Sequence, residues 1–270
     1  MRAWASALVV TVFCIACDRE TQTQQPLDVA INVVNSRDSV VLERPYDCKD
    51  PVSECSVVEI HLPVFSSQGA SGNRLLAFTL NRAVRDFYVD ALGGAVGTPM
   101  SESDTTSSMP NVIDAARLLL GDYEEFKAKY PSSPLTWVVQ GTGKVTAADS
   151  LVCVELLVDA FTGGAHGNAS TGFVVANSKT GKRVQAASLI RNVTMFTDSA
   201  ERAFRILKNI GSSEDLSDHN YFLESNKFVL PENIGLSTDS VILYYNTYEI
   251  APYALGPTRL AMPRSALQIH

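Results

Sequence analysis

The grouping of helix and strand signals along the chain constrains its fold more than any other sequence feature. Segments rich in Val and Ile, typical of strands, come first, at residues 29–34, 40–42 and 56–65. Two helices are predicted next, at 71–92 and 111–130, because apolar residues recur there at three- and four-residue spacing. The chain therefore begins its folded part with a run of strands followed by a pair of helices.

The second half of the chain mixes the same elements in another order. A third helix is predicted from 197 to 210, with acidic residues near its start. Strand signals surround it at 135–147, 150–162, 171–178, 227–230, 241–246 and 259–261. Because strands and helices do not strictly alternate, the sequence predicts an α+β fold. We expect antiparallel sheets packed with about three helices, in two closely associated subregions.

The composition is that of an ordinary globular protein. The chain has 270 residues, of which 46% are hydrophobic and 19% are charged, so it can bury a core. Its formal net charge is −7 and it has no cluster of Lys and Arg, which disfavours nucleic acid as a partner. The acidic balance favours a cationic partner, although solubility alone would also account for it.

The start of the chain is typical of a bacterial export signal. Residues 3–16 are apolar, but the run is shorter than the roughly 20 residues that a membrane-spanning helix needs. It ends at Cys17, in a pattern that resembles a lipobox with Cys14 where most lipoboxes have Leu. We therefore expect residues 1–16 to be a signal peptide, Cys17 to be acylated (palmitate included) and residues 17–27 to be a flexible tether. The alternative is simple cleavage and a soluble secreted protein.

Three cysteines lie beyond the expected tether. Cys48 and Cys55 flank a turn-prone segment, and export would place them in a compartment that permits disulfides. A local disulfide between them is predicted, whereas zinc or redox chemistry is not, because neither belongs to a CxxC pair. Cys153 lies in an apolar run and is expected to be a small core residue.

The sequence has no standard catalytic motif, but two segments are unusual. The first is Gly163-Gly164-Ala165-His166-Gly167, directly after a strong strand signal. Three glycines in five residues indicate backbone angles or close approaches that other side chains would forbid. A histidine held there can present its ring to a ligand. Alternatively, the segment is a tight turn in which His166 is satisfied internally.

The second unusual segment is 244–257, where several tyrosines lie near Glu249. Tyrosine combines a large apolar face with a hydrogen-bonding tip, which is common in recognition surfaces. The candidate ligand-binding residues are therefore His166, Tyr248, Glu249 and Tyr253. In the alternative interpretation, Glu249 caps backbone donors of the glycine-rich loop and the tyrosines fill the rim of the core.

Together these segments resemble a known family. The GGAHG loop after a strand, the Thr180-Gly181-Lys182 turn and the YEIAPYA segment at 248–254 occur in this order. The arrangement resembles the extracytoplasmic domain of unknown function shared by RsiV-type anti-sigma factors and PdaC-type peptidoglycan deacetylases. The resemblance covers about residues 54–267 and implies an α+β domain at 151–270, preceded by a companion region at 28–150.

The resemblance also implies a binding function. RsiV-type domains bind lysozyme and signal to a cytoplasmic segment, and PdaC-type enzymes carry a separate deacetylase domain. We expect neither additional part here. The chain is therefore expected to be a noncatalytic, lipid-anchored protein of the cell envelope, facing the periplasm or the exterior. Its expected ligand is a lysozyme-like cationic protein or peptidoglycan, and no cofactor or metal is expected.

Two alternatives remain open. One is a hydrolase that acts on the cell wall, with His166 and Glu249 as acid and base partners, which requires the two side chains to lie within hydrogen-bonding reach. The other is a structural or assembly lipoprotein, which would lack a concave ligand site.

Overall fold

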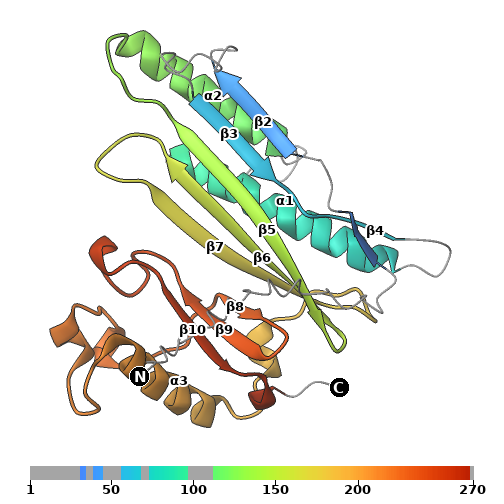
Figure 1. The fold of residues 1–270 in the computed structure, drawn as a ribbon, viewed down its shortest axis with the longest axis vertical. Coiled ribbons are helices and arrows are strands. Elements are labelled where there is room, and N and C mark those ends of the chain that lie inside the picture. The colour runs from blue at the N-terminus through green and yellow to red at the C-terminus, as the bar shows by residue number, and fades with distance from the viewer. Residues whose placement is uncertain (1–30, 35–38, 45–55, 68–72, 97–111, 268–270) are drawn as a thin grey trace, which may run out of the picture.

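The structure is a computed structural model that describes residues 31–34, 39–44, 56–67, 73–96 and 112–267 (Figure 1). Within these residues the α-helices are α1 (Arg74–Val96), α2 (Val112–Lys129) and α3 (Val193–Lys208). The strands are β1 (Ile31–Val34), β2 (Ser39–Arg44), β3 (Ser56–His61), β4 (Val64–Ser67), β5 (Val138–Ala148), β6 (Leu151–Phe161), β7 (Asn168–Asn177), β8 (Ile234–Leu236), β9 (Ser240–Tyr245) and β10 (Thr258–Pro263).

A five-stranded sheet with the order β2-β3-β5-β6-β7 forms the centre of the described structure. Helices α1 and α2 cover one of its faces, and the three-stranded sheet β10-β9-β8 lies against the other, with α3 beyond it (Figure 1). The strands pair antiparallel except for β3 and β5, which are parallel because the two helices between them return the chain to the same end. The α+β fold predicted from the sequence is confirmed.

Helix α1 forms where its apolar stripe predicts it. The side-chain oxygen of Asn73 accepts a hydrogen bond from the N–H of Leu76 at 2.9 Å and so caps the first turn. Further along the stripe, Leu80 and Tyr88 are fully buried against the sheet. The Tyr88 hydroxyl donates to the carbonyl of Thr142 in β5 at 2.6 Å, so a polar group inside this core is satisfied.

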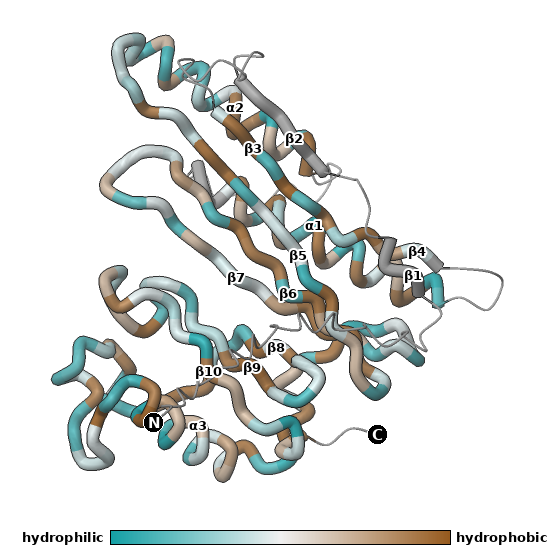
Figure 2. Tube along the Cα trace, in the orientation of Figure 1, coloured by the Kyte–Doolittle hydropathy of each residue, from teal (hydrophilic) through white to brown (hydrophobic). Residues whose placement is uncertain are grey.

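A second core lies on the opposite face of the same strands. Strand β6 contributes Val152 and Val154 to the helix side and Cys153 to the other side, where the three-stranded sheet and α3 pack. Figure 2 accordingly shows β6 as a mostly apolar strand. Because period-2 alternation sends successive side chains to opposite faces, a strand between two cores must be apolar at nearly every position.

Helix α3 begins at Val193, four residues before the predicted start. The side chain of Asn192 accepts a hydrogen bond from the N–H of Met195 at 3.0 Å, which makes Asn192 the N-cap. At the other end Asn209 adopts a left-handed conformation with φ of 56°. Asparagine tolerates this conformation better than most residues, and it ends the helix.

Two predicted strands differ from the structure, and one observed strand was not predicted. The segment 56–65 is divided into β3 and β4, because the chain leaves the sheet at Pro63, which has no backbone N–H to donate. Residues 227–230 form no strand, although Phe228 is buried in the second core. Strand β8 was not predicted, because three residues that include Gly235 give too short a signal.

The predicted boundary between residues 150 and 151 lies at the turn of the β5–β6 hairpin, and the five-stranded sheet contains residues from both sides of it. Residues 1–30 and 45–55 lie outside the described part of the chain. The predicted signal peptide, the acylation of Cys17 and the disulfide between Cys48 and Cys55 therefore remain sequence predictions.

Candidate functional site

The loop Gly163–Gly167 joins β6 to β7 at the end of their hairpin. Gly163 and Gly164 have φ of 100° and 91°, a region that glycine adopts freely and other residues avoid. A Cβ atom on Gly167 would lie 3.1 Å from the carbonyl oxygen of Ala160, so there is little room for a side chain. The glycines are therefore required by the turn itself, which leaves His166 exposed at its tip.

The His166 ring contacts two tyrosines from the second unusual segment. Its face stacks on Tyr253, with ring centroids 3.6 Å apart and an interplanar angle of 15°. Nδ1 lies 3.0 Å from the carbonyl oxygen of Gly167, and Nε2 lies 3.3 Å from the Tyr248 hydroxyl. Because a carbonyl only accepts, Nδ1 must carry hydrogen, and in the neutral ring Nε2 then accepts from the tyrosine.

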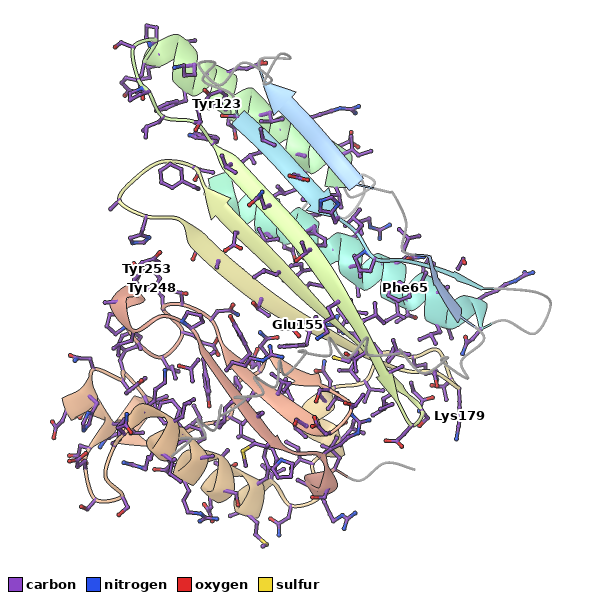
Figure 3. All side chains as sticks on the ribbon, viewed as in Figure 1. Phe65, Tyr123, Glu155, Lys179, Tyr248 and Tyr253 are labelled. Carbon is purple, nitrogen blue, oxygen red and sulfur yellow. The ribbon has the colours of Figure 1, made fainter. Side chains whose placement is uncertain are left out.

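The segment that supplies the tyrosines is anchored between them. Ile250 and Ala251 are buried in the second core, at 5% and 3% exposure, and the Ile250 carbonyl accepts a hydrogen bond from the N–H of Phe222. Tyr248 and Tyr253 flank this anchor and remain 54% and 38% exposed. Figure 3 shows the two tyrosines side by side next to the β6–β7 loop. The YEIAPYA segment therefore fixes two rings at the surface by burying the residues between them.

Tyr248 has a backbone conformation that is rare for a bulky residue. Its φ is 69°, in the left-handed region, which costs on the order of 1 kcal/mol for a side chain of this kind. Nothing in the core requires a tyrosine there, because the ring is more than half exposed. Strain of this kind often occurs at functional sites, and here it holds an exposed ring beside His166.

Glu249 does not contact His166. Its Oε2 accepts a hydrogen bond from the backbone N–H of Asn246 at 2.8 Å, so it caps its own turn and not the glycine-rich loop. Partial burial raises the pKa of Glu249, the Asn246 N–H lowers it, and the nearby carboxylate of Glu232 raises it further. The geometry thus supplies no direct contact for an acid–base pair of His166 and Glu249.

Two grooves lie on either side of the β6–β7 hairpin end. The α1-side groove, of about 480 Å³, lies between helix and sheet, with Phe87, Asp90 and His166 among its lining residues. The β5-side groove, of about 300 Å³, lies on the opposite sheet face, with Asp159 and Tyr253 among its lining residues. The aromatic cluster of His166, Tyr248 and Tyr253 therefore stands between two concave surfaces.

Of the four candidate binding residues, the structure brings three into direct contact and places Glu249 beside them. The sequence analysis missed Asp90, Asp159 and Asn168, which line the grooves. Single polar residues on a helix or strand carry no local signal, so only the tertiary fold identifies them.

In the part of the chain that the structure describes, no group of three or more His, Cys, Asp or Glu could hold a metal ion. No helix among the same residues is long and apolar enough to cross a membrane.

The fold and the site together define an α+β protein with a surface cluster of aromatic residues. Residues 193–265, which include α3, β8–β10 and the YEIAPYA segment, match the model of a family described as a protein of unknown function (DUF3298). No curated protein matches the chain in sequence.

Two solved structures share the fold over most of its length. A member of the DUF3298 family from Bacteroides fragilis is similar with a TM-score of 0.56 and 17% identity, over 88% of this chain and 91% of that one. A DUF3298 family protein from Pseudomonas aeruginosa is similar with a TM-score of 0.54 and 18% identity, over 88% and 92%. At these identities the likeness establishes the fold.

Proposed function

We propose that this chain is a noncatalytic binding module of the bacterial cell envelope, tethered by lipid at Cys17. Its ligand-binding surface centres on His166, Tyr248 and Tyr253. One observation carries the proposal: segments 82 residues apart in sequence meet to form an exposed aromatic cluster between two grooves. Burial of exposed aromatic surface is a major source of binding free energy, particularly where the rings are already held in place.

The ligand that this surface fits best is peptidoglycan. Flat aromatic faces pack against the apolar faces of sugar rings, while the histidine and tyrosine tips and the groove side chains can hydrogen-bond to hydroxyls and amides. The order of the GGAHG and YEIAPYA motifs, which resembles RsiV-type and PdaC-type domains, supports a location outside the cytoplasmic membrane. The predicted export signal and the predicted lipid at Cys17 support the same location.

A lysozyme-like cationic protein is the second candidate ligand. The net charge of −7 favours association with a basic protein through long-range attraction, and this contribution would weaken as salt is added. Binding to peptidoglycan through stacking and hydrogen bonds would depend much less on salt. The salt dependence of binding therefore separates the two ligands.

Co-sedimentation of the purified mature protein with peptidoglycan sacculi, and capture on immobilised lysozyme, test the proposal. Tyr253→Ala should weaken binding by about tenfold, because it removes the ring on which His166 stacks. Phe78→Ala is the matched control. Phe78 is an equally large and 63% exposed ring on α1, twelve residues and so roughly 18 Å along the helix from Asp90.

Equal loss of binding in both variants, or no retention on either ligand at low salt, would refute the proposed site. Release of soluble wall fragments by the wild-type protein, abolished by His166→Ala, would instead establish a hydrolase. A protein that binds without releasing fragments supports the noncatalytic module.

A further inference from the structure

The two grooves adjoin each other at the end of the β6–β7 hairpin. Ala160 and Asn168 line both of them. His166 lines the α1-side groove and stacks on Tyr253, which lines the β5-side groove. A single extended ligand could therefore lie in both grooves and cross the aromatic cluster between them.

Each groove contains one aspartate that is available to a ligand. Asp90 lines the α1-side groove and Asp159 the β5-side groove, and the side chain of neither forms an ion pair or hydrogen bond with another described residue. By contrast, the neighbouring Asp86 is paired with two arginines, at 3.5 Å and 3.3 Å. Neither Lys nor Arg occurs among the described residues that line the two grooves. The charge of both grooves is thus negative and disfavours phosphates and other anions.

Apart from His166, the remaining polar side chains that line the two grooves carry no charge. Asn168 and Ser170 in the α1-side groove, and Gln140 in the β5-side groove, offer amides and a hydroxyl that no other described residue uses. Such groups match a ligand rich in hydroxyls and amides. Partial burial, and the negative charge of Asp86 one turn away, raise the pKa of Asp90, so a cation beside this carboxylate would be favourable.

From this arrangement we infer that the two grooves bind one extended sugar chain that carries free amino groups. Its rings stack on the aromatic cluster, and its ammonium groups pair with Asp90 and Asp159. The inference rests on the proposed function and narrows its ligand from peptidoglycan in general to glycan strands whose sugars carry free, non-acetylated amino groups. A basic peptide would satisfy the charges but would not match the neutral amide and hydroxyl lining or the flat rings.

Calorimetric titration with oligosaccharides of matched length tests the inference. The probes are a chitosan oligomer (free amines), a chitin oligomer (acetylated amines) and a hyaluronan oligomer (carboxylates). At about pH 6, well above the ordinary pKa of aspartate, the chitosan oligomer should bind about tenfold more tightly than the chitin oligomer. The hyaluronan oligomer should not bind. A chitosan dimer should bind more weakly than the longer oligomer, because it cannot reach both grooves.

Charge-neutralising variants locate the contacts. Asp90→Asn and Asp159→Asn should each weaken chitosan binding about twofold to fivefold, as expected for loss of one exposed ion pair. Each should leave chitin binding unchanged, because the shape of the groove is preserved. Asp198→Asn, an exposed aspartate on α3 beyond the three-stranded sheet, is the matched control and should change neither.

Equal binding of chitosan and chitin, or unchanged chitosan binding in both aspartate variants, would overturn the inference. If Tyr253→Ala still weakened binding by about tenfold in that case, the proposed glycan-binding site would stand and only the preference for free amino groups would be lost. Binding of a lysine-rich peptide with the same dependence on both aspartates, but not of chitosan, would also overturn it. Failure of every glycan to bind would contradict peptidoglycan as the ligand.

Discussion

Asn246 pairs with the backbone of Thr171 through both atoms of its side-chain amide. Its Oδ1 accepts from the Thr171 N–H at 2.8 Å, and its Nδ2 donates to the Thr171 carbonyl at 3.1 Å. Asn233 continues this pattern, donating to the Thr171 carbonyl at 2.7 Å and accepting from the Phe173 N–H at 3.1 Å. Strand β7 is an edge of the five-stranded sheet, so the two amides occupy backbone groups that another strand would use.

These amides also connect the edge of β7 to the candidate site, because Asn246 lies two residues before Tyr248. We predict that Asn246→Ala destabilises the protein by about 1–3 kcal/mol, since it leaves both backbone groups of the buried Thr171 without this partner. The free energy of unfolding from urea titrations measures the effect. Asn168→Ala is the matched control, because Asn168 lies on the same strand, is exposed, and its side chain forms no hydrogen bond with another described residue. Equal unfolding free energies for the two variants would contradict this role.

Gly181, in the Thr180-Gly181-Lys182 turn, makes a second connection, between β7 and α1. Its φ is 70°, and a Cβ atom there would lie 2.7 Å from both the Asn73 side chain and the backbone nitrogen of Leu76. We predict that Gly181→Ala lowers the unfolding free energy by more than about 1 kcal/mol, because it adds backbone strain and displaces the cap of α1.

Gly121→Ala provides the opposite result as a control. Gly121 lies inside α2, and apart from its two chain neighbours and the adjacent helix backbone no described atom lies within 4 Å of an added Cβ. Alanine is favoured over glycine in a helix interior, so this substitution should stabilise the protein by about 0.5–1 kcal/mol. A destabilising Gly121→Ala, or a neutral Gly181→Ala, would show that the local geometry does not control stability at these positions.

Sequence periodicity predicted the elements whose signals are local. Helices α1 and α2 and strand β6 could be predicted from their own residues. In each of them the residues that face a core recur at the helix or strand period. Residues 56–65 lacked such evidence at Pro63, where Asn81 on α1 holds the backbone of Phe65 by two hydrogen bonds of 2.8 Å. That partner is distant in sequence and could not be predicted from the segment alone.

In the candidate site, too, the sequence predicted only the local features. The glycine spacing predicted a constrained turn and the tyrosines predicted a recognition surface. The contact of His166 with the rings of Tyr248 and Tyr253 was found in the structure. The alternative interpretation, in which Glu249 caps the glycine-rich loop, was wrong, because composition does not show that its carboxylate reaches the Asn246 N–H three residues away. The role of Glu249 in ligand binding stays a prediction. The grooves were not predictable, since they depend on how α1 and β5 lie against the hairpin end.

Two carboxylates should give opposite pH dependences of stability. Partial burial raises the pKa of Glu249, so the stabilising effect of its protonated form is complete in acid and is lost as pH rises through the folded-state pKa. Between about pH 4 and pH 7, the melting temperature of Glu249→Gln should therefore rise relative to wild type. Because the residue is exposed, the change should be small.

The pKa of Glu214 is shifted in the opposite direction, so its effect on stability should have the opposite pH dependence. The N–H of Gly211, at 2.7 Å, lowers the pKa of Glu214, and the side chain of His219 lowers it further. Its stabilising effect is present above the ordinary pKa of glutamate and disappears as pH falls through the folded-state pKa. Glu214→Gln should thus melt below wild type at neutral pH and approach it in acid. Parallel pH dependences in the two variants would contradict these assignments.

Cys153 should be unreactive until the protein unfolds. Its thiol is buried between the five-stranded sheet and β8. Burial raises the pKa of Cys153 to about 11. The Leu236 N–H, which donates to Sγ at 3.2 Å, acts in the opposite direction and lowers this pKa. Only the thiolate reacts with alkylating reagents, and at about pH 8 almost none is present. Peptide mapping by mass spectrometry after iodoacetamide treatment should show the Cys153 peptide unmodified in buffer and fully alkylated in urea. Rapid alkylation of the folded protein would mean that the packing between the two sheets opens readily.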